Sequence, residues 1–161
     1  DANGEAAPRL NDVMFTADEA RAHHATLIVE VVRMLCAGVV HGDLSEFNVL
    51  LGDSDGAAVP VIIDLPQAMD AAGNNHAKRM LLRDVANLRN FFGRFAPELL
   101  QTDFGHEIWG WYERGELHPD ALLTGRFVHN DAPVDVEETL REIEDALLDD
   151  AARRLRMQAA P

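Results

Sequence analysis

Polar and apolar positions along the chain predict two long helices. In the first, Thr16 and Glu19 form a capping box, and apolar-face positions then recur every three or four residues until Gly38. The second has the same spacing and ends at Gly93 and Pro97. The stripes expected to face the core are His24, Leu27, Ile28, Val31 and Leu35 in the first helix, and Leu81, Val85, Leu88 and Phe92 in the second.

Shorter patterns fill the rest of the chain. Val49–Leu51 and Val59–Ile63 are short apolar runs, and the turn-forming residues Gly52–Gly56 between them predict a β-hairpin. The pattern as a whole predicts a helix-rich α+β fold with one small hairpin. The remaining segments are an irregular stretch over residues 1–12, two short helical pieces over residues 98–124, and a last helix over residues 135–151.

Composition narrows the class of protein. The 161 residues are 47% hydrophobic, which suits one globular domain over residues 1–161. A formal net charge of −14 repels phosphate backbones, so we expect no direct nucleic-acid binding. No apolar run approaches the roughly 20 residues that span a bilayer. The single cysteine, Cys36, cannot form an internal disulfide, which together with the polar N-terminus predicts a cytoplasmic protein.

Oxygen-bearing side chains gather around the predicted hairpin. Asp43 and Asn48 lie in the loop His41-Gly42-Asp43-Leu44-Ser45-Glu46-Phe47-Asn48, and Asp64 follows the second strand. The hairpin returns Asp64 to the neighbourhood of Asn48. Phosphoryl transfer needs a carboxylate for the attacking hydroxyl and hard oxygen ligands for Mg²⁺. These residues therefore predict a metal-phosphate site, the alternative being that they only cap turns.

The same residues resemble a known family. The loop resembles the H-R-D-L-x-x-x-N loop of protein kinases, with Gly42 in place of the arginine and Asp64-Leu65-Pro66 in place of D-F-G. Ser45-Glu46-Phe47-Asn48 resembles the RIO family of atypical protein kinases, whereas antibiotic kinases of the aminoglycoside phosphotransferase type usually place a histidine after H-G-D-L. Further resemblances to RIO proteins lie in Ala7–Leu10, Ile63–Ala68, Arg83–Asn87 and Phe91–Phe92.

The resemblance implies a fold and a set of roles. The fold would be a protein-kinase-like C-terminal lobe without its N-terminal lobe. It would comprise a post-hinge segment (1–12), a catalytic and metal-binding core (13–97) and C-terminal helices (98–161). The resemblance implies that Asp43 is the catalytic aspartate and that Ser45 is a neutral hydrogen-bonding group near the γ-phosphate. Asn48 and Asp64 would be ligands of Mg²⁺ or Mn²⁺ and would bind the ATP phosphates through the ion. His41 and Asp84 would support the loop.

The implied function is ATP- and Mg²⁺-dependent phosphoryl transfer by a RIO-type serine/threonine protein kinase or ATPase, acting on a protein substrate or a ribosome-associated factor. No Gly-rich loop or strand lysine precedes His41, so we expect the chain alone to be inactive. The surface facing the missing lobe should expose apolar residues and is a candidate for self-association. The alternatives are a small-molecule, aminoglycoside-type phosphotransferase lobe and a non-catalytic docking module.

Overall fold

The structure is a computed structural model that forms two compact units, residues 1–127 and residues 128–161. In the second unit the described residues of the predicted helix over 135–151 are helical, and the rest of that helix lies outside the described residues. That residues 1–161 act as one domain stays a prediction. The structure describes residues 6–65, 68–129, 144, 147, 148 and 151.

Helix α1 (Ala17–Cys36) begins at the predicted capping box. The Thr16 hydroxyl accepts from the Glu19 backbone N–H at 3.2 Å, and the Glu19 carboxylate accepts from the Thr16 N–H at 2.8 Å. Two backbone donors at the helix start are thereby satisfied. The five stripe positions predicted for this helix are all buried. Among the described residues, no helix is both long and apolar enough to cross a membrane.

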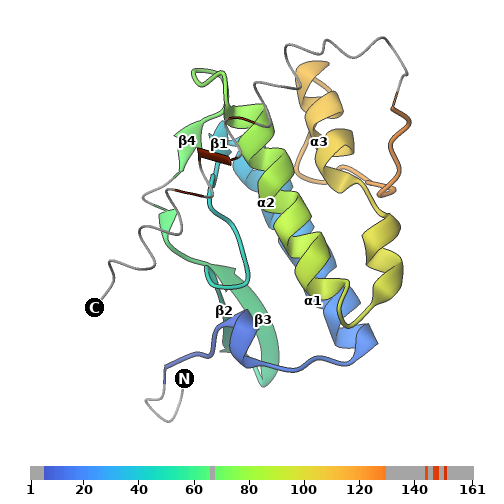
Figure 1. Ribbon diagram of the computed structural model, residues 1–161. Helices are drawn as coiled ribbons and strands as arrows, with labels where there is room; N and C mark the ends of the chain where they lie inside the picture. Colours follow the sequence, from blue (N-terminus) through green and yellow to red (C-terminus); the bar gives the residue numbers. More distant parts are fainter. Residues whose placement is uncertain (1–5, 66–67, 130–143, 145–146, 149–150, 152–161) are drawn as a thin grey trace. The chain divides into compact units, whose positions relative to one another are not determined.

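Helix α2 (Ala77–Phe92) packs beside α1 and also contacts α3, the next α-helix along the chain. Figure 1 shows α2 in the centre of the first unit, with the strands on one side of it and α3 on the other. All four predicted stripe positions are buried, which confirms the second helix and its core-facing side. A charged residue, Asp84, is buried on the same helix.

The hairpin pairs β2 (Val49–Ser54) with β3 (Ala57–Ile62) in antiparallel register. The prediction that the turn spans Gly52–Gly56 is wrong, because residues 52–54 belong to β2 and pair with β3. The turn consists of Asp55 and Gly56 alone, with φ values of 55° and 82°. Two successive residues with positive φ close a two-residue turn, which lets both strands continue up to it.

Two smaller features do not follow from the sequence patterns. Strand β1 (Val39–Val40) pairs with β4 (Met69–Asp70), a match of two-residue segments too short to be predicted. Residues 1–12, predicted to be irregular, contain the 3₁₀ turn η1 (Leu10–Asp12). Leu10 is fully buried, and the carbonyl of Pro8 accepts from the N–H of a β2 residue at 2.8 Å. The hairpin edge is thus covered.

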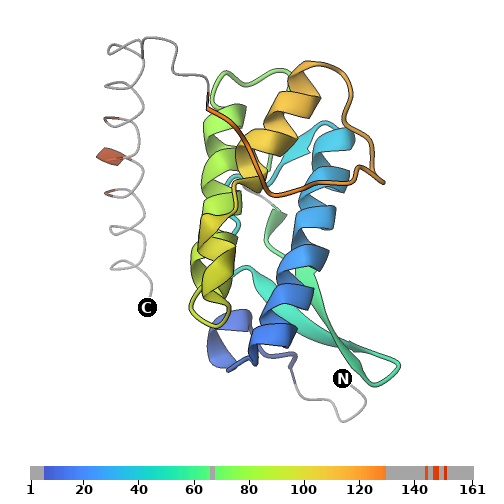
Figure 2. The same ribbon diagram turned by 90° about the vertical axis from the view of Figure 1, so that its right-hand side faces the viewer.

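The two predicted short helical pieces are η3 (Pro97–Gln101) and α3 (Phe104–Glu113). Figure 2 shows both pieces and the chain that follows them. The buried carboxylate of Glu107 ties that following chain to α3. It accepts from the Thr124 N–H at 2.8 Å, the Thr124 hydroxyl at 2.9 Å and the Gly125 N–H at 2.7 Å. Three donors satisfy a carboxylate that would otherwise be costly to bury.

Gly125→Ala should destabilise the first unit by about 2–4 kcal/mol. Gly125 has a φ of +71°, and an added Cβ would lie 2.8 Å from the ring of Phe104. The matched control is Gly115→Ala, because Gly115 has a φ of +69° and an added Cβ there would meet no atom of the described residues within 4 Å beyond its chain neighbours. The free energy of unfolding of this control should fall only by the backbone cost of a positive φ, about 1–2 kcal/mol. Urea unfolding measures both, and equal losses would contradict the packing of Phe104 against Gly125.

Candidate active site

The loop of residues 41–48, called here the 41–48 loop, is bonded to the end of β3 at two points. The carbonyl of Asn48 accepts from the Ile63 N–H at 2.9 Å. The Nε2 of His41 lies 2.9 Å from the Ile63 carbonyl. Asp64 follows directly, so both bonds hold it beside the loop. The chain therefore brings both ends of the loop to the point where Asp64 leaves β3.

His41 joins the loop to β3 through both ring nitrogens. Its Nδ1 accepts from the backbone N–H of Asp43 at 3.2 Å, so the proton sits on Nε2, which donates to the Ile63 carbonyl. A single neutral tautomer satisfies both contacts. With 3% of its surface exposed, the ring lies inside the lobe. These contacts fit the predicted supporting role of His41.

Asn48 is oriented by the backbone of Asp43. Its Nδ2 donates to the Asp43 carbonyl at 2.7 Å, and its own N–H donates to the Ser45 carbonyl at 3.0 Å. Because the amide nitrogen faces the carbonyl, the side-chain oxygen Oδ1 points away from it. Both Asn48 and Asp43 are half-buried. The hydrogen bond thus presents an oxygen rather than a nitrogen to a cation.

Asp64 has an unusual backbone conformation at the exposed side of the site. Its φ of +66° is in the left-handed region, which costs a non-glycine residue about 1–2 kcal/mol. Such local strain is concentrated at functional sites. Asp64 is exposed, so its carboxylate is accessible to a ligand. A carboxylate and an amide oxygen are hard donors that suit Mg²⁺, so this donor set fits the ion.

Helix α2 supports the loop through Asp84. The buried carboxylate accepts from the Gly42 N–H at 2.8 Å and from the Leu44 N–H at 2.9 Å. Burial raises the pKa of Asp84 to about 6, against the lowering effects of these two hydrogen bonds and of the positive charge of Arg83. Desolvation therefore outweighs the local stabilisation of the carboxylate.

Ser45 is buried, with 2% of its surface exposed. Its hydroxyl oxygen accepts from the Phe47 N–H at 3.4 Å. This burial favours a role within the loop over one at its surface. The hydrogen bond from Ser45 to a γ-phosphate stays a prediction.

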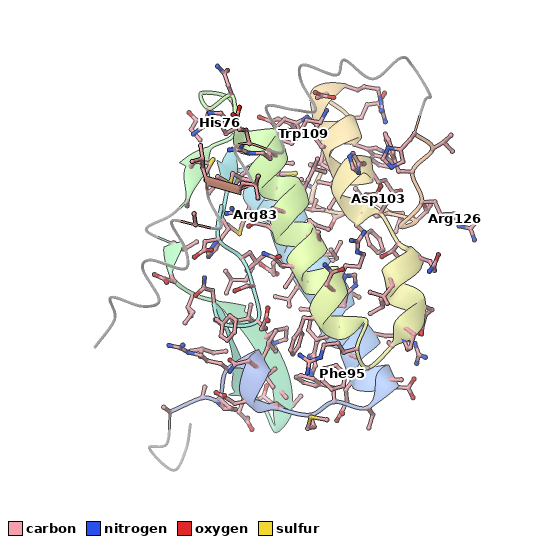
Figure 3. All side chains as sticks on the ribbon, viewed as in Figure 1. His76, Arg83, Phe95, Asp103, Trp109 and Arg126 are labelled. Carbon is pink, nitrogen blue, oxygen red and sulfur yellow. The ribbon has the colours of Figure 1, made fainter. Side chains whose placement is uncertain are left out.

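Two residues that contact the loop were missed as site residues by sequence reasoning. Arg83 donates to the Gly42 carbonyl, and Asn87 donates to the Leu44 carbonyl at 3.0 Å. Figure 3 labels Arg83 on α2. The available signal was Asp84, a polar residue within an otherwise apolar stripe. A charged residue on a buried helix face indicates a polar segment packed against it. Polar residues near it on the helix are then candidates to contact the same segment.

An apolar groove of about 510 Å³ lies between α1 and β3. Val61 and Leu65 on its wall are 47% and 52% exposed. An exposed apolar groove therefore lies next to Asp64, and that it faces a missing lobe stays a prediction. Self-association through this surface stays a prediction. The lining residues are Glu30, Met34, Ala37, Val39, Pro60, Val61, Ile62 and Leu65.

The fold and the loop define a protein-kinase-like lobe. The structure is similar to that of the Rio2 kinase-ADP/Mg²⁺-phosphoaspartate complex from Chaetomium thermophilum, with a TM-score of 0.51 and 24% identity over 70% of this chain and 41% of that one. The family model of the RIO domain matches residues 1–104. The chain belongs to the RIO domain family.

Curated relatives are named as kinases. The serine/threonine-protein kinase RIO1 of Chaetomium thermophilum is 34% identical over 108 residues, 61% of this chain and 20% of the relative. RIO3 of Caenorhabditis elegans is 39% identical over 104 residues, 62% of this chain and 19% of the relative. The RIO-type kinase Rio1 of Haloferax volcanii is 41% identical over 81 residues, 47% and 26% respectively. The chain thus spans about a fifth to a quarter of these relatives.

Proposed function

We propose that the chain carries the catalytic loop and metal ligands for ATP- and Mg²⁺-dependent phosphoryl transfer in a RIO-type serine/threonine protein kinase or ATPase. The observation that supports this most directly is the hydrogen bond from the Asn48 amide nitrogen to the Asp43 carbonyl at 2.7 Å. It fixes the spacing between a carboxylate and an amide oxygen. The two bonds of the Ile63 backbone to His41 and Asn48 support a position of Asp64 beside them.

Each residue has a distinct proposed task. Asp43 accepts a hydrogen bond from the attacking hydroxyl and takes its proton as the hydroxyl oxygen bonds to the γ-phosphorus of ATP. The bond between this phosphorus and the bridging oxygen breaks at the same time, and ADP leaves with that oxygen. Asn48 and Asp64 would hold Mg²⁺ or Mn²⁺ through oxygen atoms. When bound, the ion would neutralise charge on the ATP phosphates. His41 and Asp84 hold the loop in place, and Ser45 is the proposed neutral hydrogen-bonding group.

The proposed acceptor is a serine or threonine hydroxyl of a protein substrate or ribosome-associated factor, in the cytoplasm. The names of the relatives support a protein kinase rather than an aminoglycoside-type enzyme. Phosphate cradling by a Gly-rich loop and a strand lysine carries much of the positioning in this class of reaction, and no such motif precedes the 41–48 loop. The chain by itself is therefore proposed to have negligible ATP turnover.

Mg²⁺ at millimolar concentration should raise the melting temperature of the chain, because an ion that binds only the folded state stabilises it. Asp64→Asn should abolish this increase. The matched control is Asp55→Asn, since Asp55 is also an exposed aspartate with positive φ, at the far end of the same hairpin. Scanning calorimetry with and without Mg²⁺ measures the shift. An equal Mg²⁺ response in both variants would overturn the proposed ligand set.

A further inference from the structure

Helix α2 holds every backbone polar group of the two residues that flank Asp43. The carboxylate of Asp84 accepts from the N–H groups of Gly42 and Leu44. The carbonyl groups of the same two residues accept from Arg83 and from Asn87. The four contacts span 40 to 43 positions of sequence. Side chains of one helix therefore supply the hydrogen-bond partners that a strand or helix would obtain from its own backbone.

The backbone of Asp43 itself is bonded on both sides of its Cα. Its N–H donates to His41 Nδ1 at 3.2 Å, and its carbonyl accepts from Asn48 Nδ2 at 2.7 Å. Arg83 contacts the same peptide unit as that N–H, through the carbonyl of Gly42. Fixing the peptide units before and after a Cα fixes its φ and ψ, and so the direction of its side chain.

Asn87 acts one peptide unit further along. It holds the carbonyl of Leu44, and this peptide unit leads to Ser45, whose own carbonyl accepts from the Asn48 N–H at 3.0 Å. The contact therefore lies between the part of the loop that carries the carboxylate and the part that carries the amide ligand. Asp84 contacts only N–H groups of the loop, so it cannot replace either carbonyl contact.

We propose that Arg83 and Asn87 are positioning residues for the site: Arg83 sets the direction of the Asp43 carboxylate, and Asn87 sets its spacing from Asn48. The effect of these residues on phosphoryl transfer rests on the proposed function, whereas their effect on the backbone of the loop does not depend on it. A shift of about 1 Å at such a site can reduce the reaction rate about 100-fold, so the loss of either contact should have a large effect on activity.

Hydrogen exchange of the full chain tests the positioning without metal or nucleotide. Asn87→Ala should speed amide exchange at Asp43 and Leu44 by up to about tenfold, the equivalent of one lost hydrogen bond. The matched control is Asn90→Ala. Asn90 is an exposed asparagine of the same helix whose side chain accepts only from Arg89 among the described residues. Both changes increase helix propensity by the same amount, so the difference between the exchange rates of the two variants reports only the contact with the loop.

A second variant keeps the test decisive if Asn87→Ala is poorly folded. Asn87→Asp keeps the size of the side chain but places a carboxylate oxygen where the donor stood, so exchange at Leu44 should be at least as fast. Exchange in the loop equal to wild type in the folded variants would overturn the proposal. Equal acceleration at core amides such as Leu27 would overturn it too, because that result indicates general destabilisation.

The Mg²⁺ response separates this inference from the proposed function. Asn87→Ala should weaken the Mg²⁺-dependent increase in melting temperature, since the peptide unit between Leu44 and Ser45 loses a contact that sets the position of Asn48, whereas Asn90→Ala should retain it. If wild type shows no increase, the proposed function fails, and hydrogen exchange alone decides the role of Asn87. If wild type responds and Asn87→Ala responds equally, the effect of Asn87 on the metal ligand is refuted.

Discussion

Replacing Asp84 with alanine should lower the free energy of unfolding by about 2–4 kcal/mol at pH 7. The change leaves the buried N–H groups of Gly42 and Leu44 without their acceptor, at about 1–3 kcal/mol each. Amide exchange should be fastest at these two positions. Urea unfolding followed by circular dichroism measures the total loss.

The loss should increase as the pH falls, which is a sharper test. Burial raises the pKa of Asp84 from 3.8 to about 6. A folded-state pKa above the unfolded value means that the wild type gains stability on protonation, fully present below pH 3.8 and lost as the pH rises through 6. At pH 5 the loss in Asp84→Ala should exceed that at pH 7 by about 1 kcal/mol. Asp84→Asn, which keeps one acceptor, should be less destabilised. A loss independent of pH would contradict the burial of this carboxylate.

Replacing His24 with leucine should change the pH dependence in the opposite direction. His24 is buried in α1 against the rings of Phe92 and Phe104, at centroid distances of 5.9 and 5.7 Å. Its Nε2 has no hydrogen-bond partner among the described residues. Burial lowers the pKa of His24 from 6.5 to about 4, so the folded state strongly favours the neutral ring.

A lowered histidine pKa contributes stability that is present above pH 6.5 and is lost as the pH falls towards 4. Between pH 7 and pH 4.5 the wild type should lose about 2 kcal/mol more than His24→Leu. His24→Gln controls for packing, because it also lacks the titrating ring but keeps a polar side chain. Both variants should lack this loss of about 2 kcal/mol despite different absolute stabilities. If either retains the wild-type slope, another group causes it.

These opposing slopes should partly cancel in the wild type. When the pH falls from 7 to 5, His24 lowers the free energy of unfolding by about 2 kcal/mol and Asp84 raises it by about 1 kcal/mol. The net loss of about 1 kcal/mol would conceal two strongly shifted buried groups, which only the variants separate. For this reason the difference between each variant and the wild type is more informative than the wild-type profile alone.

Local patterns predicted the features that short segments determine. The capping box set the start of α1, and helical spacing identified the buried faces of α1 and α2. The order of loop, hairpin and Asp64 predicted that the chain returns to Asn48 just before Asp64, because a hairpin returns its second strand to the start of the first, and the Ile63 N–H does donate to the Asn48 carbonyl. Each of these features depends on residues within about twenty positions of one another.

Contacts between distant segments could not be predicted in this way. Strand β1 pairs with β4 through two residues on each side, which is too short for a periodic signal. Arg83 and Asn87 read as ordinary polar helix residues until α2 is placed against the 41–48 loop. The contacts of Glu107 with residues 124–125 span only 17 and 18 positions, but they could not be predicted either, because no periodic pattern marks the irregular chain that folds back to supply the three donors. Tertiary packing determines all three.

Asn48 and Asp64 are proposed to hold one divalent cation beside Asp43, and paramagnetic broadening by Mn²⁺ tests this arrangement. In two-dimensional NMR spectra of the ¹⁵N-labelled chain, substoichiometric Mn²⁺ should first broaden the side-chain amide of Asn48 and the backbone amides of Asp64 and Asp43. Excess Mg²⁺ should restore these signals by competition. Broadening confined to other acidic segments, with the Asn48 amide unaffected, would contradict the metal site and the phosphoryl-transfer function proposed from it.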